Sequence, residues 1–200
     1  MRSMGSIGGG DAKKGLREAA LRTRRSMDRD EVKLLSERVQ EKLRSLGEFE
    51  RAKVLASYVS TKDEVQTDEV ISTSLRLGKR VLVPIVDQTR TKLLFSELRD
   101  VSELGEGHYG IREPRSQFLR IVPLEEAGLI LVPLVAWDER GFRVGYGKGY
   151  FDKALGHLKD GIPTIGLAFE AQRVDRVPNE EFDIPLGSIV TERRVLRFRG

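Results

Sequence analysis

The stretch Leu129-Ile130-Leu131-Val132-Pro133 contains only apolar residues and is far too short to cross a membrane as a helix. An apolar run of this length that ends at a proline is typical of a strand buried on both faces. A half-exposed strand would instead alternate apolar and polar residues. The stretch therefore predicts a central strand of a sheet that helices cover on both sides.

Similar apolar runs recur along the chain, separated by segments with a helical pattern. The predicted strands are 54–59, 81–86 with Pro84 marking its end, 92–97, 129–133, 162–168 and 188–190. Strands that alternate with helices favour an α/β fold, a three-layer open sandwich around a mainly parallel sheet. Ligands bind beyond the carboxyl ends of such strands. The segments 62–67, 137–152 and 169–183 are therefore expected to meet at one site.

Two helices are predicted before the first strand. The first begins at Asp11, which can cap it, and ends near residue 26. Its inner face is predicted to carry Leu16, Ala19, Ala20 and Thr23. The second covers 29–46 and is expected to end at Gly47. We expect the two to form an antiparallel helical hairpin that packs against the rest of the fold.

The termini and the long connection between strands complete the domain plan. Residues 1–10 are small and rich in glycine, which predicts a disordered leader before a single domain of 11–200. The run from 100 to 124 contains three glycines and two prolines and is expected to be irregular.

The composition is that of an ordinary globular protein, with 39% hydrophobic and 33% charged residues. Without cysteine, disulfides and thiolate chemistry are excluded. No run is apolar enough for a membrane span and no export signal is recognisable, so we expect a cytoplasmic protein without a membrane partner. The net charge of +4 favours anionic ligands, although acidic residues are interspersed throughout.

A basic cluster near the end of the first helix raises the hypothesis of nucleic-acid binding. It consists of Arg22, Arg24 and Arg25. Because no aromatic residues interleave with these arginines, a solvated basic helix end is favoured and no nucleic-acid partner is expected.

The segment Arg143-Val144-Gly145-Tyr146-Gly147-Lys148-Gly149-Tyr150-Phe151-Asp152 has the features of a phosphate-binding loop. Glycine at every second position from 145 to 149 lets backbone N–H groups approach phosphate oxygens. Lys148 and Arg143 add positive charge, and Asp152 offers an oxygen ligand for Mg²⁺. A helix predicted over 150–157 would direct its N-terminus at the loop.

The glycine spacing of this segment fits neither the Walker A nor the dinucleotide-binding motif. A Gly-rich surface turn is the alternative interpretation. The presence of Arg143, Lys148 and Asp152 in one short segment favours the phosphate site.

Several single residues remain open between two interpretations. Glu64 can accept hydrogen bonds from an aminopyrimidine ring or simply precede a helix cap, and the sequence favours neither. Asp183 can bind Mg²⁺ or form a turn, and Tyr109 can stack on a planar ligand or hold its own loop. His108 and His157 have no catalytic or metal-ligand spacing, so no acid–base histidine is expected.

With these residues the sequence resembles the 5-formyltetrahydrofolate cyclo-ligase family, also called 5,10-methenyltetrahydrofolate synthetases. The resemblance extends from about Asp11 to Thr191, and its glycine segment is specific to that family. Its ordered motifs are Lys13-x-x-x-Arg17, Asp63-Glu64-Val65-x-Thr67, Gly110-Ile111-x-Glu113-Pro114, Val132-Pro133, Trp137-Asp138, the segment from Gly141 to Asp152, Asp183, and Val190-Thr191-Glu192.

The resemblance implies an open α/β sandwich related to the sugar-isomerase and CoA-transferase folds. It implies a ligase that uses ATP and Mg²⁺ to close 5-formyltetrahydrofolate to 5,10-methenyltetrahydrofolate, with phosphorylation of the formyl oxygen and release of ADP and phosphate. We expect the protein to be a monomer. The alternatives are a sugar-phosphate isomerase of related fold, which would leave Asp152 without a role, and an RNA-associated protein that uses the basic helix.

The resemblance also implies roles for individual residues. ATP would be bound by Lys13, Lys14, Gly15, Leu16, Arg17, Arg143, Val144, Gly145, Tyr146, Gly147, Lys148, Gly149, Tyr150 and Phe151. The folate would be bound by Arg17, Val59, Glu64, Tyr109, Tyr146, Gly147, Lys148, Gly149 and Tyr150. Asp152 and Asp183 would hold Mg²⁺, and Lys148, Arg143 and Tyr150 would be catalytic. Tyr109 stands where the family often has tryptophan, and Phe151 where it often has tyrosine.

Overall fold

The computed structural model describes residues 9–87, 89–90, 92–158, 161–180 and 183–198 of the chain. Within this part, eight strands form one central sheet in the order β12-β11-β10-β7-β1-β2-β3-β6. The strands are β1 (Val54–Ala56), β2 (Arg80–Asp87), β3 (Lys92–Leu98), β6 (Ile121–Val122), β7 (Leu129–Val132), β10 (Thr164–Leu167), β11 (Ser188–Val190) and β12 (Val195–Arg197). The pairings from β11 through β10, β7 and β1 to β2 are parallel, and the outer pairings are antiparallel. The predicted mainly parallel sheet is confirmed.

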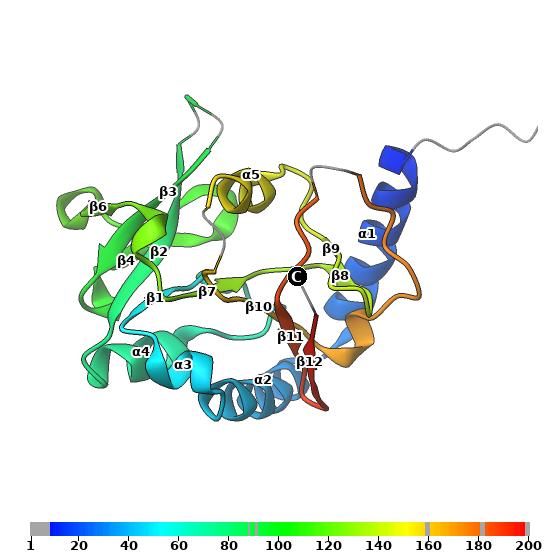
Figure 1. Ribbon diagram of the computed structural model, residues 1–200, viewed down its shortest axis with the longest axis horizontal. Coiled ribbons are helices and arrows are strands. Elements are labelled where there is room, and N and C mark those ends of the chain that lie inside the picture. Colours follow the sequence, from blue (N-terminus) through cyan, green and yellow to red (C-terminus); the bar gives the residue numbers. More distant parts are fainter. Residues whose placement is uncertain (1–8, 88, 91, 159–160, 181–182, 199–200) are drawn as a thin grey trace, which may run out of the picture.

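Helices cover both faces of this sheet. They are α1 (Gly9–Ser26), α2 (Arg29–Arg44), α3 (Gly47–Arg51), α4 (Asp68–Arg76) and α5 (Tyr150–Gly156), with 3₁₀ turns η1 (Val101–Glu103), η2 (His108–Gly110), η3 (Ser116–Phe118), η4 (Leu124–Glu126) and η5 (Glu170–Gln172). Figure 1 shows α5 above the sheet, α2, α3 and α4 below it, and α1 at one end beside β8 and β9. The three-layer sandwich and the N-terminal pair of helices follow the prediction. No helix in the described ranges is long and apolar enough to cross a membrane.

Two short ribbons stand outside the main sheet. One pairs β4 (Leu104–Glu106) with β5 (Arg112–Pro114), and the other pairs β8 (Ala136–Trp137) with β9 (Arg143–Val144). Each follows a strand of the central sheet in the chain, so the ribbons carry the segments that lead into the site.

The central strand β7 explains why its sequence is apolar throughout. Leu129 and Leu131 pack in the cluster that includes Leu43 of α2, while Ile130 and Val132 pack on the other face with Leu155 of α5. All four residues of β7 are 0% exposed. Because successive strand side chains point to opposite faces, a strand between two helical layers must be apolar at every position.

Several elements differ from the prediction. Strand β2 continues past Pro84 to Asp87, because β1 pairs with it only as far as Leu82 and a proline is tolerated where one side of a strand is free. Gly47 begins α3 rather than closing α2, since Ser45 caps α2 with backbone bonds. The run from 100 to 124 contains η1, β4, η2, β5, η3 and β6 and is not irregular. Strand β12 was not predicted.

The start of the chain is also different from the prediction. Helix α1 begins at Gly9, so Asp11 lies inside it and the last two residues of the predicted leader are helical. The rest of that leader, 1–8, lies outside the described residues. The predicted inner face of α1 was wrong in part, because Ala19 and Thr23 are exposed, while Ala20 and Arg24 are buried.

A substitution at Gly166 in β10 tests how tightly the core between the sheet and α5 is packed. A Cβ atom at Gly166 would lie 2.6 Å from Leu186 Cδ1 and 2.8 Å from Leu134 Cδ2. We expect Gly166→Ala to lower the free energy of unfolding by about 1–3 kcal/mol, because leucine methyl groups must shift in a filled core. Urea unfolding measures it, with Gly156→Ala as the control, since a Cβ there meets nothing within 4 Å. Equal midpoints for the two variants would contradict the packing described.

Candidate functional site

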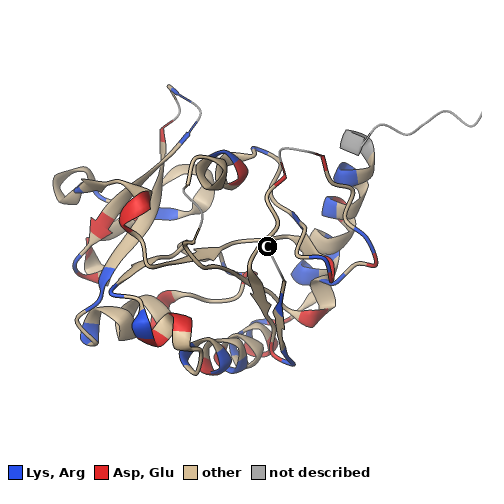
Figure 2. Cartoon of the chain, in the orientation of Figure 1, with Lys and Arg blue, Asp and Glu red and all other residues tan. Residues whose placement is uncertain are grey.

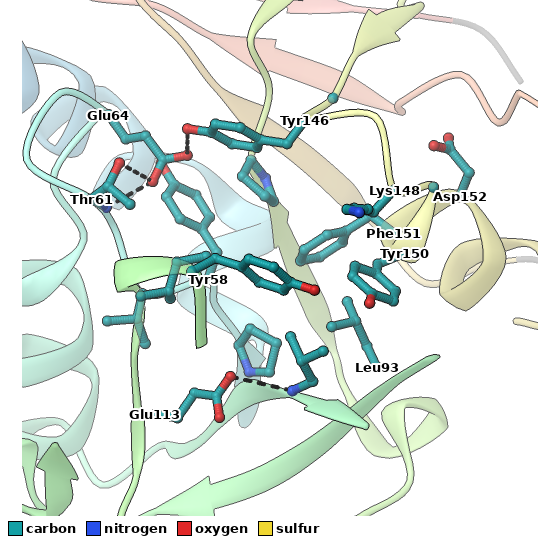
Figure 3. A pocket seen from close by; sticks show the side chains of 18 of the residues that line it. Tyr58, Thr61, Glu64, Leu93, Glu113, Tyr146, Lys148, Tyr150, Phe151 and Asp152 are labelled. Atoms are coloured by element: carbon teal, nitrogen blue, oxygen red, sulfur yellow. Dashed lines mark hydrogen bonds between the residues drawn. The ribbon is translucent and has the colours of Figure 1, made fainter. Parts of the chain in front are cut away.

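A cavity of about 310 Å³ lies where β1, β2 and β7 end, as expected for a parallel sheet. Its wall includes Val59 after β1, Val86 in β2 and Pro133 after β7. In Figure 3, Glu64 and Tyr146 lie at the top and Glu113 at the bottom, with Tyr150, Phe151 and Leu93 along the right-hand side. Carboxylates on opposite sides of an apolar cavity suit a flat ligand whose edges carry hydrogen-bond donors.

Glu64 is held in the cavity wall by a fixed set of donors. Its Oε2 accepts from Thr61 N at 2.7 Å and from Thr61 Oγ1 at 3.0 Å, and its Oε1 accepts from the Tyr146 hydroxyl at 2.7 Å. The residue is only 5% exposed. Because ionised carboxylates offer about four acceptor sites, Glu64 retains capacity for a ligand. The geometry favours the ligand-contacting interpretation that the sequence left open.

The two tyrosines beside Glu64 stay protonated. Burial raises the pKa of Tyr146 well above its ordinary value, and the negative charge of Glu64 raises it further. Burial followed by the charge of Glu64 also raises the pKa of Tyr58. The Tyr146 hydroxyl is therefore a proton donor toward Glu64 over the physiological pH range.

The glycine loop connects β9 to α5 and packs against α1. Gly147 and Gly149 have φ angles of +98° and +65°, in the region that favours glycine. Arg17 of α1 donates from Nε to the carbonyl oxygen of Gly145 at 2.7 Å. A Cβ atom at Gly147 would lie 3.1 Å from the Arg17 guanidinium carbon. The glycines therefore provide both the loop conformation and the close approach of α1.

The two cations of the glycine segment, Lys148 and Arg143, differ in exposure. Lys148 is exposed and lines the cavity. Arg143 is 7% exposed and donates to Asp152 Oδ1 and to the Ile184 carbonyl oxygen, both at 2.8 Å. Burial lowers the pKa of Arg143, while the negative charges of Asp152 and Asp183 oppose that effect. Lys148 is thus the exposed cation of the loop, whereas Arg143 lines the cavity with its guanidinium held by Asp152 and Ile184.

The predicted metal ligands lie on either side of Arg143. Asp152 bonds to Arg143, and Asp183 accepts from Lys13 Nζ and from the backbone N–H of Glu180. Within the described part of the chain, no group of three or more His, Cys, Asp or Glu residues is placed to hold a metal ion. Mg²⁺ commonly takes one or two carboxylates and completes its shell with substrate phosphates and water. A pair of aspartates beside the glycine loop fits that donor set.

The predicted site residues fall into two groups. Those that line the cavity are Val59, Glu64, Tyr109, Arg143, Gly145, Tyr146, Lys148, Gly149, Tyr150, Phe151 and Asp152. Those outside its lining are Lys13, Lys14, Gly15, Leu16, Arg17, Val144, Gly147 and Asp183. Arg17 still contacts the loop at Gly145, and Lys13 pairs with Asp183. Lys14 and Gly15 are exposed on α1, and Leu16 packs in a small core with Val144.

Tyr109 has a strained backbone at the cavity. Its φ of +58° is the one positive value at a non-glycine position among the described residues. Its side chain lines the cavity, although the residue is 62% exposed. Burial and a hydrogen bond with Tyr109 raise the pKa of Tyr150. Strain of this kind persists where the surroundings impose it, often at ligand sites, and here it places Tyr109 against the loop residue Tyr150.

Sequence reasoning missed several residues of the site, among them the charged residues Glu113 and Arg24. Glu113 lines the cavity at 8% exposure, and its carboxylate lies 3.1 Å from His108 Nδ1 and 3.4 Å from the Val86 amide nitrogen. Arg24 is 1% exposed and contacts Tyr146, contrary to the predicted solvated helix end. The signal for Arg24 was present, because Lys13, Arg17, Ala20 and Arg24 recur at helical spacing.

Comparisons with known proteins give one consistent result. The model of the 5-formyltetrahydrofolate cyclo-ligase family matches residues 10–192. The 5-formyltetrahydrofolate cyclo-ligase of Haemophilus influenzae is 34% identical over 73% of this chain and 79% of its own length. That of Escherichia coli K12 is 35% identical over 72% and 80%. The NMR structure of Aquifex aeolicus 5,10-methenyltetrahydrofolate synthetase aligns with a TM-score of 0.82 and 34% identity, covering 94% of this chain and 93% of that one.

Proposed function

The chain belongs to the 5-formyltetrahydrofolate cyclo-ligase family, whose members convert 5-formyltetrahydrofolate to 5,10-methenyltetrahydrofolate, and on that premise we propose which substrate binds in its cavity and which at its glycine loop. The cavity takes the pterin end of the folate. The glycine loop takes the phosphates of ATP, the co-substrate that the family implies.

One observation supports this assignment of the two substrates. Glu64, which suits a pterin edge, and Lys148, which suits a phosphate, line the same continuous cavity (Figure 3). A ring system held at Glu64 would have its substituents directed toward the loop, which is the arrangement that transfer between two bound molecules needs.

The chemistry of the formyl group explains why a phosphate donor is needed. A formyl amide carbon is a poor electrophile, so N10 of the folate does not close the ring unaided. Transfer of the γ-phosphoryl group to the formyl oxygen turns that oxygen into a leaving group. N10 then attacks the carbon, its proton is lost, and phosphate departs. Such a transfer needs alignment and charge neutralisation more than a protein nucleophile.

The residues of this chain have separate roles in these reaction steps. Lys148 neutralises charge that develops on the transferred phosphoryl group, and the loop N–H groups approach its oxygens. Arg143 holds Asp152 in place from inside the protein. Asp152 and Asp183 would hold Mg²⁺, which when bound screens the negative charge of the ATP phosphates. Tyr109 and Tyr150 form an aromatic wall beside the ligand.

Glu64 recognises the pterin in this proposal. The amino group and the ring N–H of a pterin are adjacent donors, and a carboxylate accepts from both at once. The apolar wall formed by residues such as Val59 and Phe151 excludes water from these bonds and so strengthens them.

We further propose that the protein acts in the cytoplasm as a monomer without nucleic acid. The cavity and its loop are built from one chain. Figure 2 shows acidic and basic residues mixed along α2, whereas the charged bands visible on α1 are basic. With Arg24 buried, the predicted basic cluster retains only Arg22 and Arg25 as exposed arginines.

An absorbance assay tests the proposed function. Purified protein mixed with 5-formyltetrahydrofolate and MgATP should develop the near-ultraviolet band of the conjugated methenyl product, with one ADP released per product formed. Omitting ATP, or chelating Mg²⁺ with EDTA, should abolish the rise. A flat trace with the complete mixture would refute the proposal. A rise that persists without ATP would refute the phosphate role of the glycine loop.

A further inference from the structure

Arg24 is a buried cation that the proposed reaction does not use. It lies on α1, two turns beyond Arg17, and is 1% exposed. Its guanidinium reaches three separate parts of the chain. Nε and Nη2 donate to Asp63 Oδ2 at 3.3 and 3.2 Å, Nη1 donates to the Leu134 carbonyl oxygen at 3.4 Å, and Nη2 donates to the Tyr146 hydroxyl at 2.5 Å. Such a set fixes the guanidinium in one orientation.

Tyr146 connects Arg24 to Glu64 through two hydrogen bonds of its hydroxyl group. Its hydroxyl accepts from Arg24 and donates its single proton to Glu64 Oε1 at 2.7 Å. The Arg24 guanidinium carbon also lies 5.4 Å from the centre of the Tyr146 ring, so the cation contacts the ring as well as the hydroxyl. Because Tyr146 has one proton to give, the bond from Arg24 determines that this proton points toward Glu64.

The arrangement balances the charge of Glu64 without a direct contact between the guanidinium and the Glu64 oxygens. Burying a carboxylate in an apolar wall is costly unless a cation lies near it. A guanidinium paired directly with Glu64 would fill both oxygens with a bidentate contact. Within the described hydrogen bonds, Arg24 instead pairs with Asp63 and reaches Glu64 through Tyr146.

Thr61 provides the second part of this arrangement. Its hydroxyl lies 3.0 Å from Glu64 Oε2 and 3.1 Å from Asp63 Oδ1, and it has one proton for the two acceptors. Arg24 occupies Asp63 Oδ2 and leaves Oδ1 to Thr61. The hydroxyl can therefore turn to Asp63 and release a lone pair of Glu64 when a ligand donor arrives.

We propose that Arg24 is a positioning residue for the folate substrate, acting through Tyr146 and Asp63 to keep Glu64 oriented with acceptor capacity on both oxygens. This inference rests on the proposed function. It makes α1 a contributor to folate recognition as well as to the loop.

Steady-state kinetics of Arg24→Met test the inference, with Arg25→Met as the control because Arg25 is the exposed arginine next in the chain. We expect Arg24→Met to raise the KM for 5-formyltetrahydrofolate by about tenfold or more, since the hydrogen bond that fixes Tyr146 is lost. The KM for ATP should stay within about twofold, because the loop contacts of Arg17 remain. Arg24→Lys retains the charge and should recover part of the loss.

A double-mutant cycle with Tyr146→Phe separates positioning from a general structural effect. If Arg24 acts through Tyr146, the double variant should raise the folate KM no more than the larger single variant, rather than by the product of the two. Tyr146→Phe keeps the Arg24–Asp63 pair, so it carries the test even if Arg24→Met does not fold. Multiplying effects, or a folate KM in Tyr146→Phe equal to that of the Arg25→Met control, would overturn the inference. No turnover by the wild-type chain would instead overturn the proposed function.

Discussion

Replacing Lys148 by alanine is expected to lower kcat for methenyl formation by about 10²–10³-fold, the usual cost of removing one group that stabilises transition-state charge. Lys148 is the exposed cation of the glycine loop and lines the cavity. In a largely dissociative phosphoryl transfer the protein contributes charge and alignment, so loss of this lysine removes part of that charge.

The fold should be unaffected by that change. Because the Lys148 side chain is exposed, Lys148→Ala is expected to unfold within a few degrees of the wild type. Lys153→Ala, at an exposed position on α5 one turn beyond the loop, is the matched control and should retain full activity. Product absorbance and ADP release measure the turnover of the two variants, and thermal melts measure their stability. Turnover of Lys148→Ala within about threefold of the control would rule out the phosphate role of the loop.

Replacing Arg143 by methionine is expected to remove activity and to weaken the fold as well. The Arg143 side chain is 3% exposed and that of its partner Asp152 is 29% exposed. Breaking a buried ion pair costs about 3–5 kcal/mol, and the partial exposure of Asp152 places the expected loss at the lower end. Asp152 would then lose the donor that holds it beside the loop, so kcat should fall by at least about 10²-fold.

Two further variants separate the structural from the functional loss. Arg143→Lys retains the charge but has no planar fork to reach both Asp152 and the Ile184 carbonyl oxygen, so it should regain stability more than activity. Arg173→Met breaks a surface pair with Glu139, exposed by 41% and 50%, and should cost less than about 1 kcal/mol. Urea unfolding and kcat measured below the melting range supply both readouts. An Arg143→Met variant as stable as Arg173→Met would contradict the buried pairing.

Much of the fold followed from the sequence because its strands are buried on both faces. A fully apolar strand such as β7 has few alternatives, and the phosphate-loop pattern lies in one continuous segment. Short elements were harder to predict. Strand β12 has three residues and, within the described sheet, pairs with β11, so its existence depends on that pairing rather than on its own sequence pattern.

The missed site residues show the same limitation at the level of side chains. Arg24 was interpreted with its exposed neighbours Arg22 and Arg25, because adjacent arginines in a helix form a basic cluster in sequence. In space they point to different sides, and only Arg24 continues the inner face from Arg17. Its acceptor atoms belong to Asp63, Leu134 and Tyr146, which no local pattern connects.

Helix α1 is anchored by a core of its own. Ala20 packs with Val135, Ala136, Val144 and Val177, apart from the two large clusters that join the sheet to the other helices. The energy that keeps α1 in place is therefore largely independent of the energy that holds the sandwich together. We expect heat or mild denaturant to release this helix as a local opening, which would break its contacts to Asp183, Gly145 and Tyr146. Activity should then be lost at a lower temperature than the one at which the whole fold melts.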